Sequence, residues 1–118
     1  MRRFLFFPAI LFAVGASQAA VPKIQEKYEC RGQADGKEYM MSLAIQAKGQ
    51  NYFLNWGGGS VVGIGLRLDN HLAVSFVHLQ SRSLGAAIYE VAEGKLEGRW
   101  VSGDGAVYRE TCSVGLRA

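Results

Sequence analysis

Apolar and polar residues alternate along most of this chain, in short runs separated by glycine, asparagine and aspartate. A period of two places successive side chains on opposite faces of a β-strand, whereas an amphipathic helix needs a period near 3.6 residues. Because the runs after residue 26 follow the shorter period, the pattern predicts an all-β domain. The eight expected strands cover residues 27–32, 38–47, 51–56, 61–68, 72–79, 86–91, 96–101 and 106–113.

The segments between these runs are short and contain residues that tolerate a positive φ angle. Glycine, asparagine or aspartate occurs in each of them, at residues 34–36, 48–50, 57–59, 69–70, 80–85, 93–95 and 102–104. Connections of this length join antiparallel neighbours. We therefore expect an antiparallel meander in which each strand pairs with the next.

The alternation also predicts which side chains of the second to fifth strands share one apolar face. These are Tyr39, Met41, Leu43 and Ile45, then Tyr52, Leu54 and Trp56, then Val62, Ile64 and Leu66, then Leu72, Val74 and Phe76. The opposite positions are mixed or polar. One side of the sheet is therefore expected to face water.

Eight short antiparallel strands can close into a small barrel whose interior is filled by side chains or holds one small ligand. The two cysteines favour closure, since Cys30 lies in the first expected strand and Cys112 in the last. A disulfide needs Cα atoms within roughly 7 Å, and pairing of the first strand with the last would supply that. The sequence predicts a closed barrel with this disulfide, with a β-sandwich as the alternative.

Residues 1–19 differ from the rest and are typical of a signal peptide. Arg2 and Arg3 precede an apolar run at 4–14, and small residues follow at Ala16, Ser17 and Ala19. The run is shorter than the roughly 20 residues of a membrane-crossing helix, and no cysteine marks a lipid anchor. We expect export to the periplasm or the medium, no stable membrane anchor, and a single all-β domain over residues 20–118.

Loss of the signal peptide changes the charge of the chain. Removing Arg2 and Arg3 from the 13 basic residues leaves 11, against 10 acidic residues that all follow residue 19. Both signs are interspersed along the strands. A nucleic-acid partner is not expected, because such proteins cluster lysine and arginine on one face.

Catalytic and metal-binding arrangements are not apparent. His71 and His78 are seven residues apart, which places them on opposite faces of a regular strand, and Ser60 follows three glycines without a nucleophile-elbow motif. Glu90 and Glu110 could form an acid and base pair, but surface carboxylates on outward strand positions are the ordinary case. We expect a non-enzymatic protein without a cofactor or metal.

A binding role is the leading functional prediction, with an unknown protein or a small apolar ligand as the partner. Gly63, Gly65 and Gly98 interrupt good strand formers, and such glycines mark bends or the close approach of an aromatic ring. Trp56 and Trp100 are candidate partners of these glycines, or core residues. The tentative ligand-binding residues are Tyr52, Trp56, Tyr89 and Trp100, since aromatic residues dominate binding sites.

Several short motifs occur in an order that is typical of one family. They are Tyr52-x-Leu54-x-Trp56, Gly63-Ile64-Gly65, Leu72-Ala73-Val74, Tyr89-Glu90-Val91, and Glu93-Gly94-Lys95 leading into Leu96-x-Gly98-x-Trp100. In this the chain resembles a family of small exported bacterial β-domain proteins, largely uncharacterised, some of which carry a fibronectin-binding label. The resemblance implies an extracytoplasmic β domain without catalytic residues.

A second motif lies near the C-terminus. The segment Ser102-Gly103-Asp104-Gly105-Ala106-Val107-Tyr108 resembles the Ser-Gly-x-Gly-x-x-Tyr loop of periplasmic inhibitors of c-type lysozyme. The resemblance implies, as an alternative function, lysozyme inhibition through Ser102, Gly103, Gly105, Tyr108 and Arg109, with Ser102 and Arg109 occupying the catalytic carboxylates. In those inhibitors another tryptophan-containing strand follows the loop, whereas here the Trp100 strand precedes it.

Overall fold

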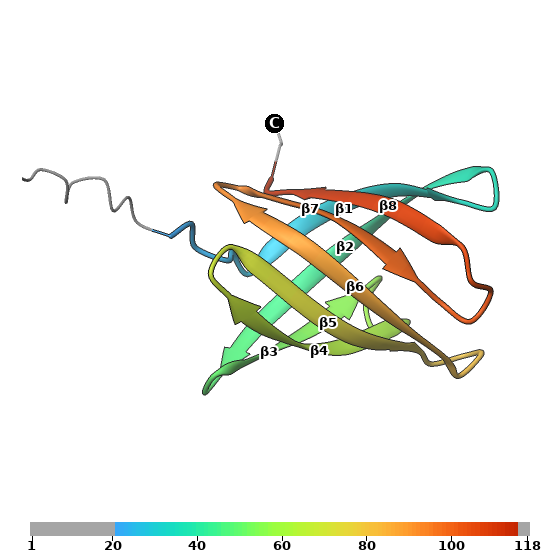
Figure 1. The fold of residues 1–118 in the computed structure, drawn as a ribbon, viewed down its shortest axis with the longest axis horizontal. Helices are drawn as coiled ribbons and strands as arrows, with labels where there is room; N and C mark the ends of the chain where they lie inside the picture. Colours follow the sequence, from blue (N-terminus) through green and yellow to red (C-terminus); the bar gives the residue numbers. More distant parts are fainter. Residues whose placement is uncertain (1–20, 116–118) are drawn as a thin grey trace, which may run out of the picture.

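The computed structural model describes residues 21–115, which form a closed antiparallel β-barrel (Figure 1). Its strands are β1 (Lys27–Ala34), β2 (Lys37–Lys48), β3 (Asn51–Trp56), β4 (Val61–Leu68), β5 (His71–His78), β6 (Ser83–Ala92), β7 (Lys95–Val101) and β8 (Val107–Ser113). Among these residues no helix is long and apolar enough to cross a membrane. The predicted signal peptide lies outside the described residues.

The barrel closes where β1 pairs with β8. This ladder joins four residue pairs, from Glu29 opposite Ser113 to Gly32 opposite Glu110, and is the shortest of the eight. Cys30 lies directly opposite Cys112, with a Cα separation of 3.8 Å, and the two form a disulfide. The predicted barrel, meander and disulfide are confirmed, and the strands do not form a sandwich.

Hairpin turns join consecutive strands, as the glycine pattern predicted. The turn between β3 and β4 is the most dependent on glycine, because Gly57, Gly58 and Gly59 all have positive φ angles, of 60°, 70° and 113°. Side chains at such positions are strained. Several predicted boundaries differ by one or two residues from the strands of the structure. The largest difference is in β6, which begins at Ser83, so Gly85 lies within the strand rather than in the preceding turn.

The connections divide between the two ends of the barrel. The turns after β1, β3, β5 and β7 share one end, which we call the open end; the turns after β1 and β7 lie on the right in Figure 1. The turns after β2, β4 and β6 share the other end with the segment 21–26, and we call this the closed end.

Aliphatic side chains fill the interior near the closed end. Leu43, Leu54, Leu72 and Leu96 are almost completely inaccessible to solvent, and Ile24 from the segment before β1 is buried with them. That segment is attached to the barrel by two backbone hydrogen bonds. Ile45 N–H donates to the Glu26 carbonyl at 2.8 Å, and Gln25 N–H donates to the Tyr28 hydroxyl at 2.8 Å.

The predicted apolar face of β4 is wrong. Val62, Ile64 and Leu66 lie on the outer surface, and the inner positions between them are Gly63 and Gly65. The reason is space, because a Cβ atom at Gly63 would meet Phe76 and the Ser75 carbonyl, and one at Gly65 would meet Leu72 and Val74. The side chains of β5 fill the interior that β4 leaves empty.

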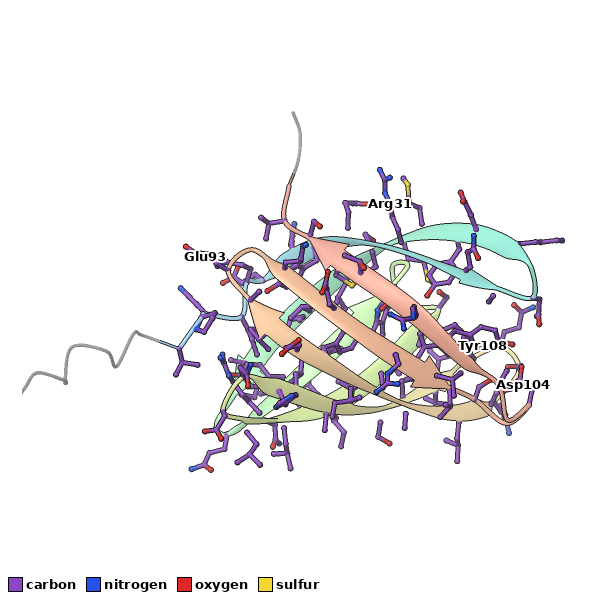
Figure 2. The ribbon with its side chains drawn as sticks, turned by 45° about the horizontal axis from the view of Figure 1, so that its top comes forward. Arg31, Glu93, Asp104 and Tyr108 are labelled. Atoms are coloured by element: carbon purple, nitrogen blue, oxygen red, sulfur yellow. A yellow bond between two sulfur atoms is a disulfide. The ribbon has the colours of Figure 1, made fainter. Side chains whose placement is uncertain are left out.

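The outer surface has two different halves. Over β3 to β6 it carries exposed apolar side chains, including Ile64, Leu66 and Leu84, which are 54%, 62% and 72% exposed. Over β1, β7 and β8 the outward positions carry charges such as Arg31, Glu97, Arg99 and Arg109 (Figure 2 labels Arg31). The expectation of a mixed or polar outer face, made for the second to fifth strands, holds for β2, β3 and β5 and fails for β4.

Candidate functional site

A cavity of about 210 Å³ occupies the interior near the open end. Its walls are mainly aromatic, and a single carboxylate lies among them. The residues that define it are Tyr39, Trp56, Phe76, Tyr89, Trp100 and Glu110. Tyr89, Glu110 and Trp56 are buried, whereas Tyr39 and Trp100 are half-buried. The cavity is smaller than the 300 to 1,000 Å³ of pockets for drug-sized ligands.

Strand alternation brings these side chains together from five different strands. Tyr39 comes from β2, Trp56 from β3, Phe76 from β5, Tyr89 from β6 and Trp100 from β7. The Phe76 ring lies edge-on to both indoles, with centroid distances of 5.9 Å to Trp56 and 6.1 Å to Trp100. Aromatic pairs favour this geometry, so the wall is a connected set of rings.

Glycines on neighbouring strands make room for these rings. A Cβ atom at Gly98 would meet the Tyr89 ring and the Ile88 carbonyl, and one at Gly85 would meet the Phe76 ring. The prediction that in-strand glycines accommodate aromatic side chains is therefore correct, but the residue it named for Gly98 is wrong. The ring beside Gly98 is that of Tyr89, not of a tryptophan.

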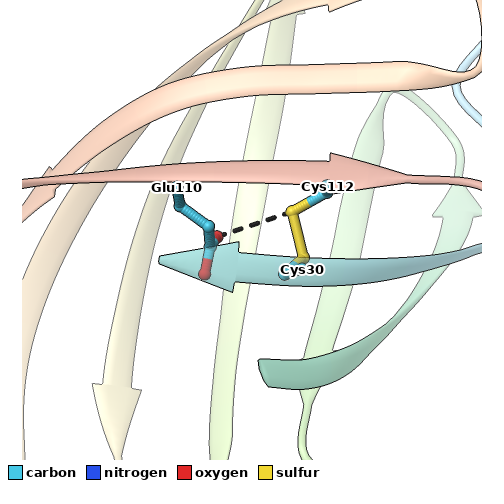
Figure 3. Close-up of side chains that lie close together, drawn as sticks. All are labelled: Cys30, Glu110 and Cys112. Atoms are coloured by element: carbon cyan, nitrogen blue, oxygen red, sulfur yellow. Dashed lines mark hydrogen bonds between the residues drawn. A yellow bond between two sulfur atoms is a disulfide. The ribbon is translucent and has the colours of Figure 1, made fainter. Parts of the chain in front are cut away.

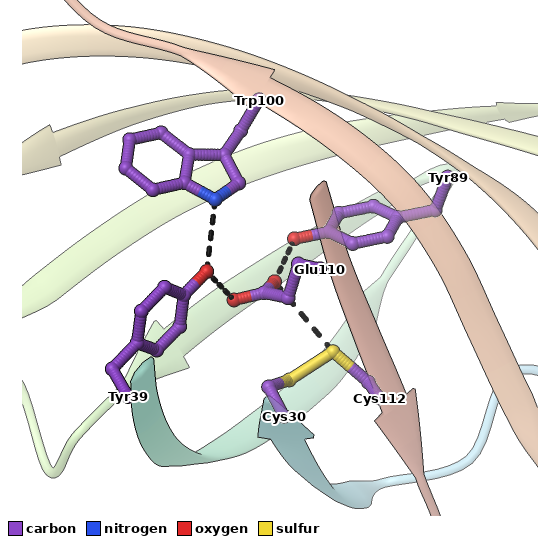
Figure 4. The surroundings of a disulfide bond; sticks show 6 residues. All are labelled: Cys30, Tyr39, Tyr89, Trp100, Glu110 and Cys112. Carbon is purple, nitrogen blue, oxygen red and sulfur yellow. Dashed lines mark hydrogen bonds between the residues drawn. A yellow bond between two sulfur atoms is a disulfide. The ribbon is translucent and has the colours of Figure 1, made fainter. Parts of the chain in front are cut away.

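Glu110 projects from β8 to the inner end of the cavity and is 5% exposed (Figure 4). The Tyr89 hydroxyl donates to Oε1 at 2.5 Å and the Tyr39 hydroxyl donates to Oε2 at 3.0 Å. Trp100 Nε1–H in turn donates to the Tyr39 oxygen at 2.8 Å. Two tyrosine hydroxyls thus donate to one carboxylate, and the Trp100 indole donates to one of these hydroxyls.

The electrostatics of this cluster follow from its burial. Desolvation raises the pKa of the Glu110 carboxyl, and hydrogen bonds from Tyr89 and Tyr39 offset only part of that effect. Burial, followed by the charge of Glu110, raises the pKa of Tyr89 well above its ordinary value and raises that of Tyr39 as well. Both tyrosines therefore stay protonated and remain hydrogen-bond donors at neutral pH.

The disulfide forms the border between the cavity and the aliphatic interior. Cys112 Sγ lies 3.6 Å from Glu110 Oε1 (Figure 3), a contact rather than a hydrogen bond because a disulfide sulfur carries no proton. The ligand atoms of Cys30, Glu110 and Cys112 lie within 4.8 Å of one another. Both sulfurs are bonded to each other, so this group offers no thiolate to a metal in the oxidised protein.

Three of the four predicted ligand residues meet at this cavity, namely Trp56, Tyr89 and Trp100. Tyr52 does not, because it lies at the other end of β3, opposite Gly65 and Ala47, and packs against the aliphatic interior. Tyr52 is therefore not part of this cavity. A strand that spans the barrel places the two ends of one apolar face in different regions.

Glu110 is the residue that sequence analysis misplaced, since it was assigned to the surface. The sequence does contain a signal that Glu110 faces inward. Cys112 faces the interior, where its disulfide closes the barrel, and Glu110 is two residues from Cys112 on the same face of β8. Glu90 is exposed on the outer face of β6. The two carboxylates therefore lie on opposite sides of the barrel wall and form no acid and base pair.

The prediction that His71 and His78 lie on opposite faces of their strand is confirmed. His71 is exposed on the outer face of β5, whereas His78 lies on the inner face at the rim of the cavity. The His78 ring packs edge-on against Phe76, with a centroid distance of 5.7 Å. Among residues 21–115 the two imidazoles share no common set of metal ligands.

A groove opens in the wall beside Glu110, where β1 and β8 stop pairing beyond Gly32. Tyr108 lines this groove, and its hydroxyl lies within hydrogen-bond distance of two carboxylates, Asp104 Oδ2 at 2.6 Å and Asp35 Oδ1 at 3.2 Å. The hydrogen bond that Tyr108 donates to Asp104 raises the pKa of Tyr108 to about 12, and the same bond lowers the pKa of Asp104. Tyr39 and Glu110 line both this groove and the cavity.

The segment that resembles an inhibitor loop forms the turn between β7 and β8. Ser102, Gly103 and Gly105 lie in this turn, and Asp104 Oδ1 accepts a hydrogen bond from Ala106 N–H at 2.9 Å. Tyr108 stacks near Trp100 with a centroid distance of 4.6 Å. Figure 2 shows Asp104 and Tyr108 together at this end.

Arg109, the second residue expected to enter a lysozyme cleft, is exposed on the outer face of β8 opposite Arg99. It therefore lies on the opposite face of the strand from Tyr108 and is not part of the turn that contains Ser102. Lysozyme inhibition stays a prediction from the loop motif.

No family model, curated protein or solved structure matches this chain.

Proposed function

We propose that this chain is an exported, non-enzymatic binding protein that takes up a small, mainly apolar ligand in the cavity at the open end of its barrel. The observation that carries the proposal is the aromatic cavity itself. Apolar pockets with a few convergent polar groups are the usual form of small-molecule sites. The disulfide is compatible with an oxidising compartment outside the cytoplasm.

Packing supports this assignment over a purely structural role. The interior near the closed end excludes solvent with aliphatic side chains, and the same barrel at the open end leaves about 210 Å³ between rings that project inward. Empty volume in a protein interior costs stability. A ligand that fills the cavity would recover the lost contacts.

The two tryptophans provide the test, because Trp56 and Trp100 are the only ones in the chain and both line the cavity. Titration of the oxidised protein with a panel of small aromatic compounds, neutral, cationic and anionic, should change the tryptophan emission in a saturable way. Isothermal titration calorimetry should give the same dissociation constant. A panel that leaves both the emission and the heat unchanged would contradict the proposal.

Trp100→Ala and Phe53→Ala form a matched pair of variants for this experiment. Trp100 lines the cavity, whereas Phe53 is a partly exposed ring on the outer face of β3. We expect Trp100→Ala to weaken binding by about fivefold or more, since one good aromatic contact contributes on the order of 1 kcal/mol. Phe53→Ala should bind as the unaltered protein does.

A further inference from the structure

Glu110 is a buried carboxylate that has no cationic partner among the described residues. The ion pair in this part of the chain joins Lys95 and Glu97, both on the surface, and every side chain that donates a hydrogen bond to Glu110 is a neutral tyrosine. Buried charges in proteins are normally paired with an opposite charge or a metal. A carboxylate that faces a cavity without such a pair lacks the cation that would balance it.

The aromatic walls favour a cation in the same place. The faces of tryptophan, tyrosine and phenylalanine rings attract ammonium groups within about 6 Å, more strongly where water is excluded. Tyr39, Trp56, Phe76, Tyr89 and Trp100 surround the cavity at whose inner end Glu110 lies. Ring faces and an ionised carboxylate both give a negative electrostatic potential, which favours a cation.

The hydrogen-bond donors of the cluster are already used. Tyr89 and Tyr39 donate to the two oxygens of Glu110, and Trp100 donates to Tyr39. A carboxylate accepts about four hydrogen bonds, so Glu110 keeps acceptor capacity after these contacts. An ionised Glu110 carboxylate would repel an anionic ligand, whereas a protonated amine would supply a donor that the carboxylate can still accept.

We infer that the cavity at the open end binds an organic cation, an ammonium group attached to a small apolar body, with Glu110 as its counter-charge and the aromatic rings as its walls. This inference rests on the proposed binding function and specifies its ligand class. The volume of about 210 Å³ fits an amine with one ring or a short branched chain rather than a drug-sized molecule.

Three ligands of nearly equal size and shape test the inference on the full oxidised protein: 2-phenylethylamine, 2-phenylethanol and phenylacetate. At pH 7 they carry a positive charge, no charge and a negative charge. Calorimetry and tryptophan emission should give the amine an affinity at least about tenfold higher than the alcohol, with phenylacetate weakest. Equal binding of amine and alcohol, or tighter binding of the alcohol, would overturn the inference.

The variant Glu110→Gln removes the charge and keeps the size of the side chain. We expect it to lose the preference for the amine over the alcohol. The control is Glu90→Gln, which removes a carboxylate from the outer face of β6 and should leave all three affinities unchanged. If Glu110→Gln does not fold, the comparison of the three ligands on the unaltered protein still decides the question.

The two proposals fail in different ways. Binding of the alcohol without preference for the amine would leave the small-ligand function intact and refute the inference that the ligand is a cation. Failure of all three ligands, together with the wider panel, would remove the small-ligand function itself.

Discussion

The two ends of the barrel interior are built by the same strands and yet differ in how tightly they pack and in which side chains fill them. Near the closed end, aliphatic side chains such as Leu72 and Leu96 pack without access to solvent, and Ile24 covers them. Near the open end, rings surround a cavity and a buried carboxylate. The comparison shows that one barrel can combine an interior that excludes solvent with a cavity at its other end.

The disulfide joins these two regions, and its loss should have the largest effect on stability. Replacing Cys30 and Cys112 together by alanine frees a loop of 82 residues, for which the chain-entropy model gives a loss of about 4 kcal/mol. The pair also fastens the shortest ladder of the barrel, between β1 and β8. Urea unfolding of the oxidised protein and the double variant would measure the difference. A loss below about 1 kcal/mol would show that the ladder holds without it.

Shortening a side chain at the closed end should cost stability and leave binding unchanged. Leu72 is fully buried, and Leu→Ala changes in protein cores cost about 3 kcal/mol. The ligand affinity of Leu72→Ala should match that of the unaltered protein, measured well below its unfolding temperature. A large change in affinity would mean that the two ends are coupled.

Adding a methyl group under the cavity wall should have a smaller effect on stability and a clear effect on binding. Gly98→Ala places a Cβ atom against Tyr89 and the Ile88 carbonyl, and overpacking of this kind costs about 2 kcal/mol. Because Tyr89 donates to Glu110, its displacement should also weaken ligand binding. Gly103→Ala, in a turn with no atom within 4 Å of the added carbon, is the control.

The smallest effect should be a pH dependence that belongs to Glu110. Its pKa is raised in the folded state by burial, so the folded protein binds a proton more readily than the unfolded chain does. Stability from this group is therefore full below the ordinary glutamate pKa of about 4.3 and is lost as pH rises through the raised value. The free energy of unfolding, measured against pH, should show this decline in the unaltered protein and lack it in Glu110→Gln.

The sequence was sufficient to predict the barrel, because strand period, turn residues and the positions of Cys30 and Cys112 all favour one closed meander. It was misleading for β4, where the apolar residues face outward. The alternation there is equally regular in either orientation, and only the contacts between Gly63 and Phe76 decide which face is inside.

The candidate site was predictable in part for the same reason. Trp56, Tyr89 and Trp100 were named because aromatic residues dominate binding sites, although Tyr52 has the same character and lies elsewhere. Glu110 was missed because a glutamate on a strand is usually exposed. Its inward direction follows from the register of β8 only once Cys112 is known to face the interior.

The most direct measurement of the central claim is a ¹H–¹⁵N correlation spectrum of the oxidised protein during titration with 2-phenylethylamine. The account predicts that the indole N–H signals of Trp56 and Trp100 and the amide of Glu110 shift together and saturate, while the amides of Leu72 and Leu96 stay in place. Shifts confined to the outer apolar face, at Ile64 and Leu84, with both indole signals unmoved would contradict it.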